Sequence, residues 1–294
     1  MKLATVRGPD GSTVAVRIDG DTATELGVPD VGAVLRGAEL SAVAETVGTQ
    51  HPVESLDYAP LVTEPGKIIC VGLNYRAHIL EMKRDLPEYP VLFAKFADCL
   101  VGDGDDIVLP PESDQIDWEG ELAVVIGTRV RRATAEQAQA AIAGYSICND
   151  VSMRDWQFRT REWLQGKIWA DSTPLGPVLA TPDEIPDEAY LVTTVDGVEK
   201  QRGDIHDLVH DPVQLVEYIS TVLPLNPGDV IVTGTPGGVG HAREPQEFLS
   251  AGQTVTVTID GIGTLSNTTV AERSSERGAG AGQGVPEPVA QGAS

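Results

Sequence analysis

The chain carries, at residues 117–127, the segment Asp117-Trp118-Glu119-Gly120-Glu121-Leu122-Ala123-Val124-Val125-Ile126-Gly127. Leu122 to Ile126 is a short apolar run that ends at a glycine, which predicts a buried strand. Side chains of an extended chain alternate between two faces, so Glu119 and Glu121 should project to one side, about 6 to 7 Å apart along the chain. Both carboxylates could then converge on one ion, and Gly120 leaves the opposite side open.

From Lys67 onward the chain is mostly β in character. Turn pairs at Asp196-Gly197 and Asp260-Gly261 predict antiparallel hairpins, which argues against a doubly wound parallel sheet. We therefore expect a mostly β, α+β fold with short helices, arranged as a mixed β-sandwich or rolled barrel. The predicted strands are Ile68 to Val71, Val91 to Ala94, Leu122 to Ile126, Tyr145 to Cys148, Leu191 to Val195, Val230 to Val232 and Val255 to Ile259.

Helical patterns interrupt these strands at three places. They are Thr134 to Ala143, which a Thr134/Gln137 capping box opens, then Arg154 to Leu164 and Pro212 to Val222.

The chain divides into three parts by composition. Residues 1–62 alternate short strands (Lys2 to Val6, Val14 to Ile18) with helical patterns (Val31 to Leu35, Leu40 to Val47), which predicts a small N-terminal α+β domain. Residues 67–272 hold the strands and helices predicted above and form the larger predicted domain. Residues 274–294 hold almost no large apolar side chain, so we expect a disordered tail.

The net charge and the hydropathy of the chain exclude several classes of binding partner. Forty-four acidic and 21 basic residues give a net charge of -23, which repels nucleic acid and anionic membranes. An anionic substrate would need a local positive centre, such as a bound metal ion. Neither a signal peptide nor an apolar run of about 18 residues is found, so we expect a cytoplasmic protein. Cys70, Cys99 and Cys148 lack metal or disulfide spacing and are interpreted as buried apolar residues.

A third carboxylate ends another predicted strand. Asp150 follows Tyr145 to Asn149, and a strand end could deliver it to the same spot as Glu119 and Glu121. Three carboxylates suit a hard cation, Mg²⁺ or Mn²⁺ first and Ca²⁺ as a substitute. The alternative is the solvated face of a strand in a very acidic protein, and spacing alone does not decide between them.

Two further patterns are compatible with catalysis. His78 and Glu81 are three residues apart on one face of a predicted helix, where the carboxylate could orient the imidazole as a general base. An ordinary surface pair has the same spacing. The glycine-rich segment from Pro227 to Gly240 has bare amides, and with the Thr235 hydroxyl it could cradle a carboxylate, but it lacks the ending of a phosphate loop.

Taken together and in order, these motifs resemble the fumarylacetoacetate hydrolase family over roughly residues 65 to 270. The matching residues are Cys70-Val71-Gly72-Leu73-Asn74-Tyr75, His78, Glu81, Trp118-Glu119-Gly120-Glu121-Leu122, Asn149-Asp150-Val151-Ser152, Gly166-Lys167, Pro174-Leu175-Gly176-Pro177 and Gly234-Thr235-Pro236.

The resemblance implies roles for nine side chains and a homodimeric assembly. Mg²⁺ or Mn²⁺ would be bound by Glu119, Glu121 and Asp150. The pair His78 and Glu81 would form a catalytic dyad on a lid helix. The catalytic Lys167 would lie beside the reacting oxygens, and the substrate carboxylate or oxo groups would be held by Arg154, Gln157 and Thr235.

The implied activity is divalent-metal-dependent cleavage of a carbon-carbon bond in a small anionic 2-oxo acid, through a metal-bound enolate. Acylpyruvate or fumarylpyruvate hydrolysis and oxaloacetate decarboxylation could share one site. The alternatives are an isomerase or tautomerase of 2-hydroxy-diene dioates in aromatic catabolism, and a non-catalytic oxo-acid-binding protein.

The chain departs from the family pattern at two positions. Ala170 stands where many relatives carry an aspartate, with Asp171 one position later, which leaves the local partner of Lys167 open. Lys95-Phe96 replaces a common Lys-Pro pair, and we interpret this as a change in packing only.

Overall fold

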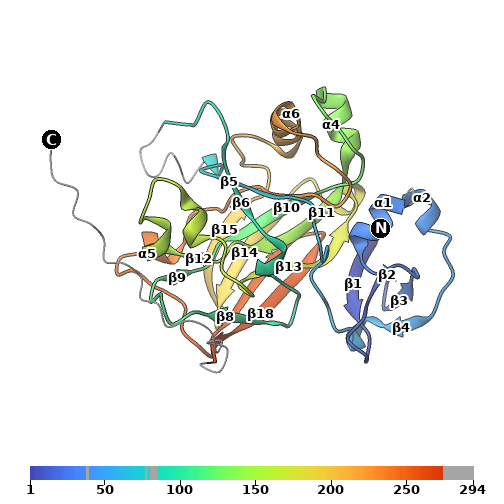
Figure 1. The fold of residues 1–294 in the computed structure, drawn as a ribbon, viewed down its shortest axis with the longest axis horizontal. Coiled ribbons are helices and arrows are strands. Elements are labelled where there is room, and N and C mark those ends of the chain that lie inside the picture. Colours follow the sequence, from blue (N-terminus) through green and yellow to red (C-terminus); the bar gives the residue numbers. More distant parts are fainter. Residues whose placement is uncertain (38–39, 77–78, 80–84, 274–294) are drawn as a thin grey trace, which may run out of the picture.

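The computed structural model describes residues 1–37, 40–76, 79 and 85–273 (Figure 1). The predicted dyad residues His78 and Glu81 and the predicted tail 274–294 lie outside the described residues. In the described part of the chain, no helix combines the length and the apolar character that crossing a bilayer requires.

Within the described residues, the larger sheet has 11 strands, and its pairs are antiparallel except β16 with β5 and β7 with β13. The path runs β4 (Gln50–Pro52), β3 (Thr22–Glu25), β2 (Thr13–Asp19), β1 (Lys2–Arg7), β13 (Thr173–Ala180), β11 (Ile142–Asn149), β10 (Gly120–Ile126), β16 (Val230–Val232), β5 (Ile68–Gly72) and β6 (Val91–Lys95); β7 (Leu100–Val101) pairs with β13.

A second sheet packs against the first. Its order is β15 (Val198–Asp204), β14 (Tyr190–Val195), β17 (Thr254–Ile259), β18 (Gly263–Ala271) and β8 (Asp106–Leu109). The hairpins predicted at Asp196-Gly197 and Asp260-Gly261 are confirmed, because they join β14 to β15 and β17 to β18 in antiparallel pairs. Short strands β9 (Ile116–Asp117) and β12 (Ser152–Met153) form a separate pair. The predicted mostly β fold of mixed sheets is confirmed.

Strand β10 divides the interior because both of its faces are buried. Leu122 packs in the core between the sheets, with Leu191 and Val257 of the second sheet. On the opposite face, Ala123 and Val125 belong to a different core cluster. The odd-numbered positions of β10 therefore form one face, as the alternation of an extended chain requires.

Two helices cover one part of the larger sheet and lie side by side (Figure 1). They are α4 (Ala135–Ala141) and α6 (Pro212–Val222), and they pack on Val124 and Ile126 of β10. The capping box at Thr134 is confirmed, since its side chain accepts from the Gln137 amide and the Gln137 side chain accepts from the Thr134 amide.

The predicted helix from Arg154 to Leu164 is wrong in length. Helix α5 spans only Arg154–Gln157, and a 3-10 turn follows at Trp163–Gly166. The chain folds back so tightly that a Cβ on Gly166 would lie 2.5 Å from the Cβ of Gln157. This return brings Gly166, and with it Lys167, back against Gln157 at the end of α5.

The first 62 residues extend the larger sheet. Strand β1 pairs antiparallel with β13, with Lys2 opposite Ala180. Helices α1 (Val31–Gly37) and α2 (Leu40–Val43) accompany these strands at the blue end of Figure 1. The division into domains at residues 62 and 67 stays a prediction.

Further 3-10 turns lie at Val53–Ser55, Ala97–Cys99, Pro182–Glu184 and Gly240–Ala242.

We expect G120A to lower the free energy of unfolding by about 1 to 3 kcal/mol, because overpacking strains a close-packed core. A Cβ on Gly120 would lie 2.3 Å from Thr193 Oγ1 and 3.0 Å from Val257 Cγ1. The control is G37A, since a Cβ on Gly37 meets nothing within 4 Å. Urea denaturation checks both variants, and equal midpoints would contradict the tight contact between the sheets.

Candidate metal centre and active site

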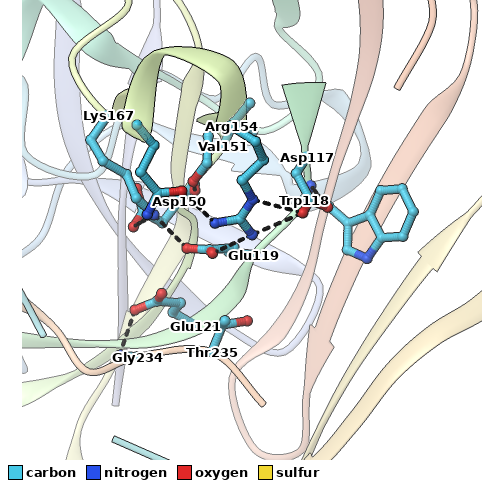
Figure 2. Close-up of polar contacts among 12 residues, drawn as sticks. Asp117, Trp118, Glu119, Glu121, Asp150, Val151, Arg154, Lys167, Gly234 and Thr235 are labelled. Carbon is cyan, nitrogen blue, oxygen red and sulfur yellow. Dashed lines mark hydrogen bonds and ion pairs between the residues drawn. The ribbon is translucent and has the colours of Figure 1, made fainter. Parts of the chain in front are cut away.

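Three buried carboxylates converge at the start of β10 and the end of β11. The pairing of these strands sets Gly120 opposite Asn149, and the Asp150 amide donates to the Glu119 carbonyl oxygen at 2.8 Å. One oxygen from each of Glu119, Glu121 and Asp150 lies within 4.8 Å of the others. The structure therefore brings together the three predicted metal ligands (Figure 2).

Two buried lysines neutralise part of this charge. Lys167 Nζ donates to Glu119 Oε2 at 2.5 Å and to Asp150 Oδ2 at 2.7 Å. Lys95 Nζ lies 3.0 Å from the other oxygen, Asp150 Oδ1, and donates to the carbonyl oxygen of Lys167 at 2.5 Å. Each oxygen of Asp150 thus faces one ammonium group.

Arg154 connects the centre to another buried acid (Figure 2). Its Nη2 lies 2.6 Å from Glu119 Oε1 and 2.8 Å from Asp117 Oδ2. Its Nη1 donates to Gln157 Oε1 at 2.8 Å. Because that oxygen accepts from Arg154, the Gln157 NH₂ group is left as the donor toward a ligand.

The pKa values of these groups differ sharply. Burial opposes ionisation of Glu119, but the charges of Arg154 and Lys167 outweigh it and lower its pKa to about 2. Burial raises the pKa of Glu121 well above its ordinary value, and the negative charges of Asp150 and Glu119 raise it further. Burial lowers the pKa of Lys167, but Asp150 and Glu119 more than compensate, so the net pKa is raised.

The donor set fits a hard divalent cation. Among the described residues, Glu121 forms no ion pair with lysine or arginine, and the Gly234 amide donates to its Oε2 at 2.5 Å. When all of them are ionised, the four buried acids of this site (Asp117, Glu119, Glu121, Asp150) exceed its three buried cations (Lys95, Arg154, Lys167) by one charge. Carboxylate oxygens with excess negative charge are the ligands that Mg²⁺ and Mn²⁺ prefer.

A cavity of about 250 Å³ opens over these groups. Its polar part includes Glu119, Glu121, Lys167 and the three predicted substrate-binding residues. Its walls are largely apolar. The lining residues are Val71, Gly72, Leu73, Asn74, Tyr75, Phe93, Glu119, Glu121, Arg154, Gln157, Phe158, Trp163, Lys167, Thr235, Val239, His241 and Ala242.

Two hydroxyl groups of the cavity differ in what they can donate. The Thr235 hydroxyl donates to the Gly120 carbonyl oxygen at 2.9 Å and accepts from Gln201 Nε2 at 2.7 Å, so its proton is already used. The Tyr75 hydroxyl is buried and has no hydrogen-bond partner among the described residues. Burial and the charge of Glu121 raise the pKa of Tyr75, which keeps it a neutral donor.

The structure shows the surroundings of both departures from the family pattern. Asp171 is exposed in a left-handed conformation (φ 49°), and the partners of Lys167 are Glu119 and Asp150 instead. The replacement of proline by the exposed Phe96 stays interpreted as a change in packing. Lys95, which the family pattern shares, has a buried ammonium group that contacts Asp150. A lysine at the end of an apolar strand was the signal for it.

Sequence reasoning gave no role to Asp117 or His241. Asp117 is fully buried and accepts from Arg154 and from the amides of Gly240 and His241. His241 lines the cavity directly after the glycine-rich segment. Spacing along the chain carried no signal for either role. The three cysteines are buried and free, as predicted.

A family model described as "Fumarylacetoacetate (FAA) hydrolase C-terminal" matches residues 67–270. This chain belongs to the fumarylacetoacetate hydrolase family. The human protein named oxaloacetate tautomerase FAHD2A, mitochondrial, is 40% identical over 240 residues, which cover 79% of this chain and 76% of that protein. The name of that relative places it in mitochondria, and a cytoplasmic location for this chain stays a prediction.

Two solved structures of family members are similar in fold. The 5-carboxymethyl-2-hydroxymuconate delta-isomerase from Mycobacterium smegmatis is 36% identical, with a TM-score of 0.78 over 92% of this chain and 100% of that one. The fumarylacetoacetate hydrolase from psychrophilic Exiguobacterium antarcticum is 32% identical, with a TM-score of 0.82 over 92% of this chain and 100% of that one. The family thus includes proteins named for isomerisation and for hydrolysis.

We expect Mg²⁺ or Mn²⁺ to stabilise the wild-type protein but not E121Q. At a metal concentration of 100 times the dissociation constant, the gain is about 2.7 kcal/mol. Because the folded-state pKa of Glu121 is raised, the metal-free protein loses stability as the pH rises through that pKa, and E121Q should lose less. Thermal unfolding with chelator and with added metal, at several pH values, measures both effects.

The matched control is E136Q, which changes an exposed glutamate in α4. It should respond to metal as the wild-type protein does. Equal stabilisation of E121Q by metal would contradict the role of Glu121 as a ligand.

Proposed function

We propose that this chain is a divalent-metal-dependent enzyme that enolises a small dicarboxylic 2-oxo acid, as a keto-enol tautomerase or double-bond isomerase. The observation that carries the proposal is the Lys167 ammonium group. It is hydrogen-bonded to two of the three proposed metal ligands and faces a cavity. A relative named oxaloacetate tautomerase and a neighbour named delta-isomerase support this reaction class.

Enolisation of a 2-oxo acid places negative charge on the oxo oxygen, so the site must supply positive charge there. When bound by Glu119, Glu121 and Asp150, Mg²⁺ or Mn²⁺ would supply Lewis acidity toward that oxygen. Lys167 is charged at neutral pH because its pKa is raised. It therefore serves as an electrostatic stabiliser and proton donor, and it cannot act as the general base.

The remaining groups orient the substrate. Arg154 fixes the Gln157 amide so that its NH₂ group is available, and the Tyr75 hydroxyl is a second neutral donor. Thr235 contributes through the start of β10, because its hydroxyl donates to the carbonyl oxygen of Gly120. We assign the general base to the predicted pair His78 and Glu81, which lie outside the described residues.

The second candidate is cleavage of a carbon-carbon bond in a 2-oxo acid, by hydrolysis or decarboxylation. The fold similarity to a fumarylacetoacetate hydrolase, at 32% identity, favours it. Cleavage and enolisation share the developing oxyanion, so Lys167 and the carboxylate cluster would serve both reactions. Identifying the products separates the two candidates, whereas the geometry of the oxygens does not.

The experiment uses chelator-stripped protein, Mn²⁺ or Mg²⁺, and oxaloacetate. Loss of enol absorbance without pyruvate or CO₂ is the result expected for a tautomerase. Metal-dependent pyruvate release, followed by NMR, would instead establish cleavage. Acetylpyruvate and fumarylpyruvate test hydrolysis in the same assay. Metal binding without turnover of any of these compounds would favour a non-catalytic oxo-acid-binding protein.

We expect K167M to lower kcat by about 100-fold or more, because it removes a preorganised donor from the developing oxyanion. The control is K200M, since the ion pair of Lys200 is to a half-exposed glutamate, Glu247, and Lys200 does not line the cavity. Circular dichroism and Mn²⁺ binding establish that K167M is folded. A folded, metal-binding K167M with unchanged kcat would exclude the proposed role of Lys167.

A further inference from the structure

Three of the described residues that line the cavity are basic: Arg154, Lys167 and His241. Arg154 is engaged by Asp117 and Glu119, and Lys167 by Glu119 and Asp150. Withdrawing either cation from these acids would leave a buried charge unpaired, which is costly. Of these three, His241 alone can meet a further anionic group without breaking an ion pair between buried side chains.

The structure fixes the position of His241 from two sides. Its backbone amide donates to Asp117 Oδ2 at 2.9 Å, and the same oxygen accepts from Arg154 Nε at 2.8 Å. Its ring lies 5.1 Å from the ring centroid of Phe158, which follows α5. A continuous row of contacts therefore leads from Glu119 through Arg154 and Asp117 to His241.

The neighbouring amide selects the tautomer of the imidazole. Gln246 Nε2 lies 2.9 Å from the His241 carbonyl oxygen. A carbonyl oxygen can only accept, so the side-chain nitrogen of Gln246 is the donor. The same nitrogen lies 3.2 Å from His241 Nδ1, which must then be the acceptor. The ring proton is on Nε2, which makes no hydrogen bond with a described residue and is available to a ligand.

Burial lowers the pKa of His241, as does the positive charge of Arg154, while Asp117 partly opposes them. The imidazole is therefore neutral at pH 7 in the free protein. A carboxylate placed beside Nε2 would favour the imidazolium form, which takes up one proton at Nδ1, and the amide of the exposed Gln246 would then turn away from that nitrogen.

We infer that His241 is a specificity-determining residue that holds the distal carboxylate of a dicarboxylic 2-oxo acid through its Nε2 hydrogen. The inference rests on the proposed function, in which the 2-oxo carboxylate end of the substrate lies at the acidic cluster. The distal carboxylate then lies toward His241, beside the apolar surfaces of Phe158 and Val239, where a neutral group would gain no ionic partner.

The test compares oxaloacetate with its 4-methyl ester, in which the distal carboxylate is replaced by a neutral ester group. In the Mn²⁺-loaded protein, we expect H241L to lower kcat/KM for oxaloacetate about tenfold, mainly through KM, and to leave that of the ester within about twofold. H241N keeps an N–H donor and should recover part of the loss. The control H51L removes a histidine of β4 that does not line the cavity.

The pH dependence separates a carboxylate contact from a structural role. The wild-type KM for oxaloacetate should rise as the pH increases from 5.5 to 8, because the imidazolium form that favours the dianion is lost. The KM for the ester should stay constant, and the slope should be absent in H241N. An equal loss for both compounds in H241L, or no loss for either, would overturn the inference.

The contact with His241 can be tested even if the proposed enzymatic function is wrong. If the wild-type protein turns over neither compound, calorimetric titration of both into the Mn²⁺-loaded protein replaces kinetics. A preference for oxaloacetate over the ester that H241L abolishes would still support the contact with His241. A preference that H241L retains would overturn it.

Discussion

Asp150 is the group on which the arrangement of the site depends. One of its oxygens faces Lys95 and the other accepts from Lys167, so a single buried carboxylate links β11, β6 and the turn after α5. Charges inside a protein are tolerated only when partners of opposite sign lie within contact distance. The positions of both lysines, and through Lys167 the position of Glu119, therefore follow from where β11 ends.

The same strand that presents the acids also builds the core. Positions 119 and 121 face the charged cluster, while Gly120 faces the second sheet, close to Thr193 and Val257. The residue that packs against the second sheet is thus the direct sequence neighbour of both glutamates, so the packing of the sheets and the positions of the carboxylates depend on each other. A shift of β10 along β11 would move both glutamates and break the contact between the sheets.

Local rules predicted part of this structure well. Alternation along an extended chain predicted that Glu119 and Glu121 share a side, and the strand before Asp150 predicted that it could join them. Such rules failed where the chain reverses. The helical pattern after Arg154 continues past Gln157, but the return through Gly166 that positions Lys167 depends on tertiary contacts.

Two further features were missed for different reasons. Strand β13 was not predicted because its two prolines weaken the strand signal. The roles of Asp117 and Lys95 depend on partners more than 30 residues away in sequence, which no spacing rule identifies.

The pairing of β1 with β13 also affects how readily the protein aggregates through its sheet edges. Without the first 62 residues, the end of β13 at Leu179 and Ala180 would lose its partner strand and leave amides and carbonyls unpaired, the kind of edge on which strands of other molecules add and aggregate. Strands β1 to β4 cover that end and transfer the free edge to β4, which has three residues and ends in Pro52. A short strand with a proline offers a poor template for intermolecular pairing. The N-terminal segment thereby protects the edge of the sheet, although none of its described residues lines the cavity.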